Sequence, residues 1–476
     1  MSLEQDSTPD FKDSVNRVLE EAFFPTSPAA TLRESIFSEI LAGVLGASPS
    51  TEDLDELREA MEAHEAVPDE ATAEQIWEVF EASYTTTGER GARGKKAKRY
   101  VLPFHPSIAK AIKPKETRNW GKWYRMLMTE TDPVALNTSL HDSFVTRLEE
   151  MEASNLFEQI FIDAAHELQP GTASQQADPD PIKPYVASCA TRFQEDLRVW
   201  LDDEYDSPTN WLQSTKDLFC FHFMMYYLQL SINLRAEFQA AADGELETFE
   251  PRIREIYFGL WDERATHDRR FSKEWRERDD QGLERFVYDS WGRLAALRLI
   301  NDAIPESQTS AEQPVYTLSE AVEELSETQQ QQCAAEIATF ANFEDSGTMD
   351  LPTAAVRLVH AVRRYYESRS KSNQTPISMG VNVIRQLGEG QDRRYYRTQR
   401  KVGPTLRLNR SALRFFARLF ASGQDDKHYE QFLDYLRQRG IYLDSQSQNV
   451  ALEELDEMGL IDRQSDSGGS VYVRAI

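Results

Sequence analysis

The sequence predicts a mainly α-helical protein, in which helical N-terminal and central domains precede a C-terminal winged-helix module. Apolar residues recur at spacings of three and four along most of the chain, as in Leu218, Phe221, Met225 and Leu228. That period is typical of helices that bury one face. Strand signals are scarce until the C-terminal end, where the pattern changes to three helices followed by a two-stranded ribbon.

Polar stretches rich in helix-breaking residues indicate where the helical parts of the chain end. Pro170–Asp180 is the clearest linker or long loop, and Pro305–Pro314 and Phe343–Pro352 have the same character. A chain of 476 residues is long enough for roughly two to four domains. We therefore expect an N-terminal helical domain at 1–168 with a basic segment at 90–125, a central helical domain at 183–304, a helical connector region at 315–400 and a winged-helix domain at 405–476.

The central domain contains the most apolar run of the chain, Leu218–Leu234, which is rich in aromatic residues. His222, Gln229 and Asn233 interrupt it. The run is too short and too polar for a membrane span of about 20 residues. We expect it to be the buried helix of a large domain, with His222 as a hydrogen-bonded core residue, and we expect no membrane association.

The winged-helix prediction depends on the order of elements near the C-terminus. The helices are expected at Asn409–Ser422, His428–Arg439 and Gln446–Met458, and the ribbon spans Leu460–Arg474 with a tight turn at Ser465–Gly469. Such a module docks on DNA or on protein.

The third of these helices would be the recognition helix. It begins with Ser447, Gln448 and Asn449, whose side chains could reach base edges. It continues with four carboxylates that a phosphate backbone would repel, namely Glu453, Glu454, Asp456 and Glu457. This face therefore favours protein docking, although DNA binding stays open.

The composition indicates a salt-adapted cytoplasmic protein. The formal net charge is −27, with 80 acidic against 53 basic residues, and only 14 of the basic residues are Lys. Hydrated carboxylates keep a protein soluble at high salt, where repulsion is screened within about 3 Å at 1 M. An ordinary acidic protein is the alternative. The three cysteines form no CxxC and the N-terminus lacks an apolar core, which fits a reducing cytosol.

Two basic islands break the acidic pattern. The segment 90–125 holds seven of the 14 Lys, and Trp120, Trp123 and Tyr124 lie near its end. A second island runs from Arg393 to Arg418. Such islands suit phosphate contacts with base stacking, or ion pairs with acidic surfaces of this chain or of a partner. The candidate nucleic-acid contacts are Lys95, Lys96, Lys98, Arg99, Lys113, Lys115, Arg393, Arg394, Arg397, Arg400, Lys401, Gln448 and Asn449.

No motif for chemistry is complete. Gly88–Lys96 lacks the spacing of a phosphate-binding loop, and no GxSxG element is present. Glu263 with His267, and Asp163 with His166, have the spacing of metal ligands on a helix, but no second motif completes either site. We expect no cofactor, no metal and no enzymatic activity. A metal-dependent nuclease among the 80 carboxylates remains the alternative.

Two segments resemble a known family. The C-terminal sequence Arg439–Asp444, the turn Ser465–Gly469 and the strand Val471–Val473 resemble the ending of DptG, a component of DNA phosphorothioation-dependent restriction systems. The aromatic run Phe219–Leu234 resembles the central helix of that family. The chain departs from the family pattern at Gly469, where an Asp is expected. The matches cover about a fifth of the chain.

The resemblance implies a non-catalytic subunit of an antiviral DNA restriction complex. Its partners would be ATPase and helicase-like subunits that act on DNA lacking the sulphur modification, and DNA would be held mainly through its backbone. None of the matching motifs carries catalytic residues. The alternative is a stand-alone winged-helix DNA-binding regulator or replication-associated protein.

Overall fold

The computed structural model describes most of the chain. The described residues are 37, 40, 41, 44, 45, 54–87, 99–101, 104–112, 120–153, 155–168, 181–202, 208–266, 268–277, 282–304, 317–343, 349–368, 375–389, 394–399, 402–423, 427–464 and 470–474. Within them the protein is mainly helical, as the apolar spacing predicts.

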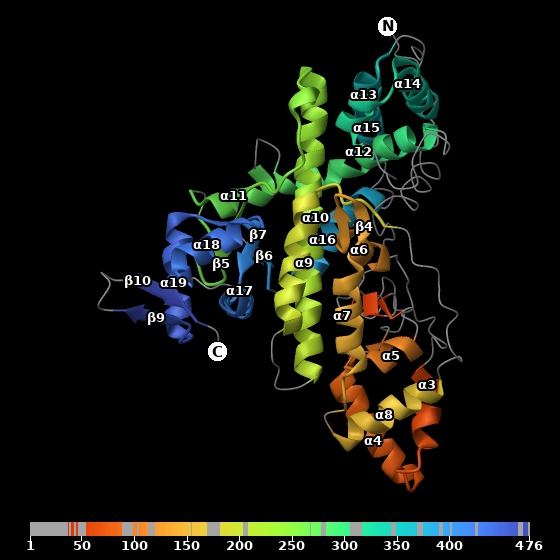
Figure 1. The fold of residues 1–476 in the computed structure, drawn as a ribbon, viewed down its shortest axis with the longest axis vertical. Helices are drawn as coiled ribbons and strands as arrows, with labels where there is room; N and C mark the ends of the chain where they lie inside the picture. The colour runs from red at the N-terminus through yellow and green to blue at the C-terminus, as the bar shows by residue number, and fades with distance from the viewer. Residues whose placement is uncertain are drawn as a thin grey trace.

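The long helix α10 (Pro208–Asp243) is the axis of the molecule (Figure 1). Its apolar residues surround the helix rather than forming a stripe, and from Leu218 to Leu234 every side chain is buried. A helix that is apolar on all sides is stable only where other elements cover every side. The prediction of a buried central helix is therefore confirmed.

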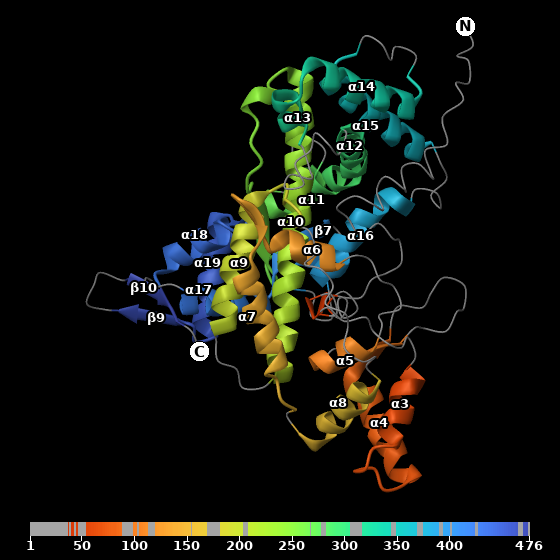
Figure 2. The ribbon, with the colours of Figure 1, turned by 45° about the vertical axis from the view of Figure 1, so that its right-hand side comes forward.

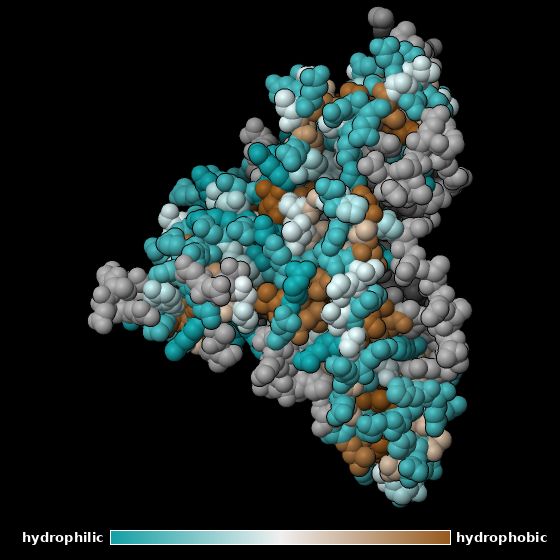
Figure 3. Space-filling model, in the orientation of Figure 1, coloured by the Kyte–Doolittle hydropathy of each residue, from teal (hydrophilic) through white to brown (hydrophobic). Residues whose placement is uncertain are grey.

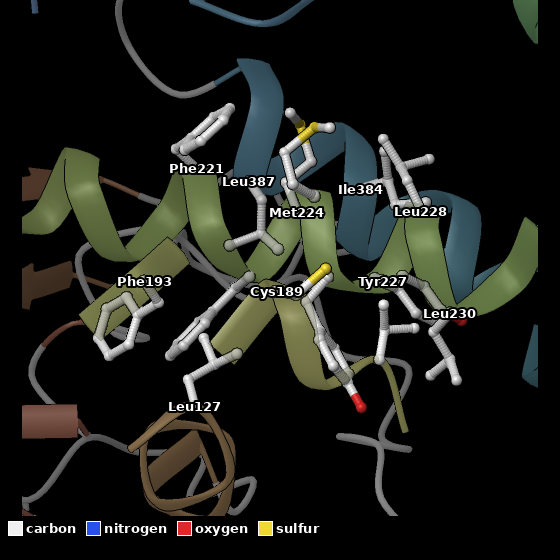
Figure 4. Close-up of a cluster of buried hydrophobic side chains, with 14 of the residues drawn as sticks. Leu127, Cys189, Phe193, Phe221, Met224, Tyr227, Leu228, Leu230, Ile384 and Leu387 are labelled. Carbon is white, nitrogen blue, oxygen red and sulfur yellow. The ribbon is translucent and has the colours of Figure 1, made fainter. Parts of the chain in front are cut away.

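Four helices cover α10 in this way. α9 (Ala187–Asp202), α12 (Leu283–Ala303), α15 (Leu351–Glu367) and α16 (Thr375–Glu389) all pack against it. Figure 4 shows Met224 and Leu228 of α10 facing Ile384 and Leu387 of α16, with Phe193 of α9 on the opposite side.

The remaining helices extend the main core at both ends. α6 (Trp120–Leu127), the β3–β4 hairpin (Thr129–Thr131 and Val134–Leu136) and α7 (Thr138–Glu149) join α9. α13 (Leu318–Glu324) and α14 (Glu327–Ala341) pack beside α15, and both start with a capping box. In a capping box, side chains satisfy the first free backbone N–H groups of a helix.

The N-terminal helices form a second, smaller core. It includes the stacked rings of Phe80 and Phe161, whose centroids lie 4.2 Å apart, together with Trp77 and Phe104. The elements around it are α3 (Leu54–Glu62), α4 (Glu70–Tyr84), the strands β1 (Thr85–Thr87) and β2 (Arg99–Val101), α5 (Pro106–Ala111) and α8 (Leu156–Glu167). Figure 2 shows α3, α4, α5 and α8 gathered at one end of the molecule.

A four-stranded sheet lies beside α10, and none of its strands was predicted from the sequence. The strands are β5 (Ile256–Leu260), β6 (Tyr396–Gln399), β7 (Gly403–Leu408) and β8 (Ile441–Leu443), in the order β6-β7-β5-β8. β5 is parallel to both β7 and β8, whereas β6 and β7 form an antiparallel pair. The sheet thus takes strands from the central, connector and C-terminal segments of the sequence.

The three C-terminal helices and the ribbon are confirmed, with ends that differ by one or two residues. They are α17 (Arg410–Gly423), α18 (Tyr429–Arg437), α19 (Ser445–Glu457) and the antiparallel pair β9 (Ile461–Gln464) and β10 (Ser470–Val473). The short strand β8, between α18 and α19, was not predicted, and it pairs with β5 instead of with the ribbon. The C-terminal elements therefore share their core with the central helices.

Hydrophilic residues cover most of the face shown in Figure 3, and hydrophobic residues appear in separate patches along its length. Among the described residues, no helix combines the length and the hydropathy needed to cross a membrane.

Candidate docking site at the C-terminal helices

The C-terminal helices are fixed to the central core by a buried carboxylate, Asp196 of α9. Arg439, which follows α18, donates from Nε to Asp196 Oδ2 at 2.7 Å and from Nη2 to Oδ1. Tyr435 Oη donates to Oδ1 at 2.8 Å, and His222 Nε2 of α10 lies 3.0 Å from Oδ2. The Asp196 and Arg439 side chains are 2% and 3% exposed. A charge pair this deep needs such additional hydrogen bonds to offset its desolvation.

The protonation states in this cluster follow from burial and charge. Burial alone would raise the pKa of Asp196, but Arg439 and His222 hold it well below its usual range. Burial lowers the pKa of His222, so its ring is neutral and donates one hydrogen bond to the carboxylate. His222 is therefore the hydrogen-bonded core residue that the sequence predicts.

The next residue, Gly440, touches the central helix directly. Its φ is +83°, a conformation that favours glycine, and an added Cβ would lie 2.6 Å from Gln229 Nε2. Gln229 in turn holds the chain before β5, because it donates to Arg254 O at 2.7 Å and accepts from Arg254 N at 2.8 Å. The central helix at Gln229 and the chain at Gly440 therefore meet in the fold.

A second polar network fixes the start of α19 to the turn after β5. Arg269 Nη2 donates to Glu263 Oε1 at 2.6 Å, to Asp444 Oδ1 at 2.7 Å and to Ser447 Oγ at 2.7 Å. Ser447 Oγ donates to Glu263 Oε2 at 2.8 Å. Asp444 is also the N-cap of α19 and accepts from Ser447 N at 3.0 Å. Burial alone would raise the pKa of Asp444, but hydrogen bonds from Arg269 and Ser447 keep it below its usual value.

The side chain of Arg407 lies at the carboxyl ends of β5 and β7. Its side chain is fully buried, and Nη1 donates to the carbonyl oxygens of Leu260 at 2.7 Å, Trp261 at 3.0 Å and Glu263 at 2.7 Å. Burial lowers the pKa of its guanidinium to about 10. In open parallel sheets, ligands commonly bind where strand order reverses at the carboxyl ends. Among the parallel strands that position lies between β5 and β8, where the network of Glu263, Arg269 and Asp444 is found.

Two described arginines of the second basic island make contacts inside the protein. Arg394 pairs with Asp217 at 2.7 Å, and the two side chains are 15% and 6% exposed. Arg397 donates to Trp261 O and lies over the Trp261 ring, 4.4 Å from its centroid. These contacts fit the alternative in which the island forms ion pairs within the chain. Arg393, Arg400 and Lys401 lie outside the described residues.

The outer face of α19 is acidic, as predicted. Glu453, Asp456 and Glu457 are exposed. Arg410 of α17 pairs with Glu454 and Glu457, and Arg463 of β9 pairs with Asp456 at 2.8 Å.

The polar residues at the start of α19 divide into three cases. Ser447 is fully buried in the network around Arg269 and does not reach the helix surface. Gln448 is half-buried and donates from Nε2 to Leu443 O at 2.8 Å. Asn449 is exposed. Of the three, Asn449 is thus the residue best placed to contact a ligand.

Part of the first basic island lies outside the described residues. This holds for Lys95, Lys96, Lys98, Lys113 and Lys115. Arg99 begins the short strand β2.

The spacing of metal ligands predicted around Glu263 does not occur on a helix. Glu263 lies in the turn after β5 and accepts hydrogen bonds from Arg269 and Ser447. His267 is outside the described residues. Asp163 lies on α8, where it faces His64 Nε2 at 3.3 Å. Among the described residues, no group of three or more His, Cys, Asp and Glu side chains could hold a metal ion.

A scan against models of protein families and a search of curated proteins both return no match for this chain.

Proposed function

We propose that this chain is a subunit of a phosphorothioation-dependent antiviral DNA restriction complex, in which it takes no catalytic part in DNA cleavage. It supports the engagement of DNA and assembles with ATPase and helicase-like subunits. The observation that carries this proposal is the contact between Gln229 and Gly440, where an added Cβ would lie 2.6 Å from Gln229 Nε2. Each of these residues belongs to one of the two segments that resemble DptG.

The contact matters because residues in one buried junction constrain each other. Gly440 has no room for a side chain beside Gln229, and Arg439 requires Asp196 as its partner. A resemblance confined to exposed loops would say little about the fold. A resemblance that includes both sides of a buried junction supports a shared arrangement of the central helix and the C-terminal helices.

In this proposal the C-terminal elements α17, α18 and α19 with the β9–β10 ribbon form a winged helix whose outer face docks on protein. The exposed acidic residues Glu453, Asp456 and Glu457 support this role, because a DNA backbone would be repelled by them. The complementary partner surface is basic. DNA is held elsewhere, through backbone contacts from the first basic island.

A purification experiment tests the docking role. The tagged chain is expressed in a salt-loving host, purified at high salt and analysed by mass spectrometry for associated proteins. We expect an ATPase and a helicase-like protein in fixed ratio. The double variant Glu453→Lys/Asp456→Lys should lose them, and the matched control Glu59→Lys, an equally exposed acid on α3, should retain them. A clean monomer would refute the proposed assembly.

A binding experiment tests the role of the first island in holding DNA. Replacing Lys95, Lys96, Lys98 and Arg99 by Gln should weaken binding of all duplex sequences. The slope of log affinity against log salt should become shallower by about 0.9 for each phosphate that the variant no longer neutralises. An unchanged slope would assign the island to protein contacts.

The alternative function is a stand-alone winged-helix regulator of DNA. The exposed side chain of Asn449 near the N-terminus of α19 favours it, since recognition helices present their N-terminal residues to the major groove. A regulator would bind a defined duplex without partners, and Asn449→Ala would relax its sequence preference.

A further inference from the structure

The N-terminal helices form a pocket of about 590 Å³ between α5, α8 and the end of α7. Pockets of about 300–1,000 Å³ are typical for small-molecule ligands. The apolar residues Leu148, Met151 and Ile162 are part of its lining. Serine and histidine side chains from separate segments also line it. The proposed docking function does not use this pocket.

The position of Ser107 in the pocket is fixed by His105. His105 is the N-cap of α5, and its Nδ1 accepts from Ser107 N at 3.2 Å, while its Nε2 donates to Met151 O at 3.1 Å. Burial lowers the pKa of His105, so the ring is neutral, and the hydrogen bond to Met151 leaves Nδ1 as the acceptor. His105 is therefore a positioning residue for Ser107.

The hydroxyl of Ser107 faces an imidazole. Ser107 Oγ lies 2.6 Å from Nε2 of His166, which is near the end of α8. The two residues are 59 positions apart in the chain, and both line the pocket. A hydroxyl within about 2.6–3.2 Å of an imidazole nitrogen has the geometry of a nucleophile with its general base.

A positively charged residue lies on the same helix as Ser107. Lys110 follows Ser107 by one helical turn, lines the same pocket and has a side chain that is 28% exposed. Its ammonium group is 3.9 Å from Glu149 Oε1, beyond the length of a strong hydrogen bond. Residues three apart share one face of a helix, so Lys110 can stabilise negative charge that develops beside Ser107.

We infer that this pocket is a hydrolytic site for carboxylic esters, with Ser107 as nucleophile and His166 as general base. Ser107 Oγ bonds to the ester carbonyl carbon while its proton moves to His166 Nε2. The carbon–oxygen bond to the leaving alcohol then breaks, and His166 returns the proton to that oxygen. Water hydrolyses the acyl-Ser107 ester by the same proton transfers and releases the acid. The acyl chain packs against the apolar residues of the pocket, Leu148, Met151 and Ile162.

This activity is independent of the restriction complex. It uses residues of the N-terminal core, whereas the proposed docking uses α19, and either can fail without the other.

A fluorophosphonate probe tests the inference on the full chain at high salt. The probe forms a bond from serine oxygen to phosphorus and loses fluoride. We expect labelling at Ser107, located by peptide mass spectrometry, and none in Ser107→Ala. Ser143→Ala is the matched control, because Ser143 is an exposed serine of α7, and it should be labelled as the wild type is. An unlabelled wild type, or equal labelling of Ser107→Ala, would overturn the inference.

The role of His166 needs its own measurement. His166→Gln should slow labelling by at least about 100-fold, because general base catalysis typically contributes that much. The loss should lie in the maximal inactivation rate and leave the concentration for half-maximal rate nearly unchanged. His360→Gln, which changes an exposed histidine of α15 outside the pocket, should retain the rate of the wild type. Unchanged labelling in His166→Gln would remove its role as a base.

The variant Ser107→Cys provides a second test that does not depend on fluorophosphonate. Ser107 is buried, as are the native cysteines Cys189, Cys220 and Cys333, so peptide mass spectrometry is used to assign the iodoacetamide label to the introduced thiol. The introduced thiol should react faster when His166 is present than in the double variant Ser107→Cys/His166→Gln. Equal rates would contradict the proposed pairing.

Discussion

The substitution Asp196→Asn should destabilise the protein far more than a change of one carboxylate usually does. The variant keeps the size of the side chain but removes the negative charge. Arg439, 3% exposed, then has no counter-charge, and Tyr435 Oη loses the anionic acceptor that lies at 2.8 Å. Removal of one partner from a buried ion pair costs about 3–5 kcal/mol. We expect a loss in the free energy of unfolding within that range.

A control near the same junction separates burial from charge. Asp434 of α18 pairs with Arg437, and these side chains are 59% and 38% exposed. An exposed pair contributes about 0–1 kcal/mol, so Asp434→Asn should cost at most about 1 kcal/mol. Both variants remove one carboxylate that faces an arginine, and they differ mainly in exposure.

The measurement is chemical unfolding of wild type and both variants at constant high salt, followed by circular dichroism. Its dependence on pH gives a further check. Asp196 has a pKa held below its usual range, so its stabilisation is present above the unfolded value of about 3.9 and is lost as pH falls below that value. The difference between wild type and Asp196→Asn should therefore shrink below about pH 4. Equal losses for Asp196→Asn and Asp434→Asn would refute the reasoning.

Three further changes test other parts of the fold. Burial raises the pKa of Glu237 to about 7. The stabilisation from its protonated form is therefore full below about pH 4.5 and is lost as pH rises through 7. In urea unfolding, Glu237→Gln should have a free energy of unfolding higher than that of the wild type by up to about 3 kcal/mol at pH 8, and by little at pH 4. Gly440→Ala should lower the free energy of unfolding by at least about 1 kcal/mol more than Gly459→Ala does. Both glycines have a positive φ, but only at Gly440 would the added Cβ clash with a neighbouring side chain. Ser447→Ala should lower the free energy of unfolding by about 1.5–3 kcal/mol, because two hydrogen bonds to charged groups are removed.

The helices could be predicted because each carries its own periodic pattern. The run Leu218–Leu234 is apolar on every side, and a buried central helix is the natural result. The strand β5, Ile256–Leu260, was missed because five residues that include Gly259 give no alternation to detect. Its position depends on two partner strands that lie far along the chain, at Gly403–Leu408 and Ile441–Leu443.

Charged residues were harder to interpret than apolar ones. Arg394 and Arg407 belong to one basic island in the sequence, yet Arg394 faces Asp217 and Arg407 faces carbonyl oxygens after β5. Their partners are separated from them by more than a hundred residues, so local charge could not reveal them. The Ser107–His166 contact was missed for the same reason, since no spacing motif links residues from two helices.

The junction around Arg439 and Gly440 also bears on how the C-terminal helices act. A winged helix on a flexible linker can search for its partner independently of the domain that carries it. Here Arg439 is tied to α9 through Asp196, Gly440 lies against α10 at Gln229, and Asp444 is tied to the turn after β5 through Arg269. A partner that binds α19 therefore binds a surface that these contacts attach to the central helices. This favours a role as a rigid connector between subunits over a role as an independent reader of DNA.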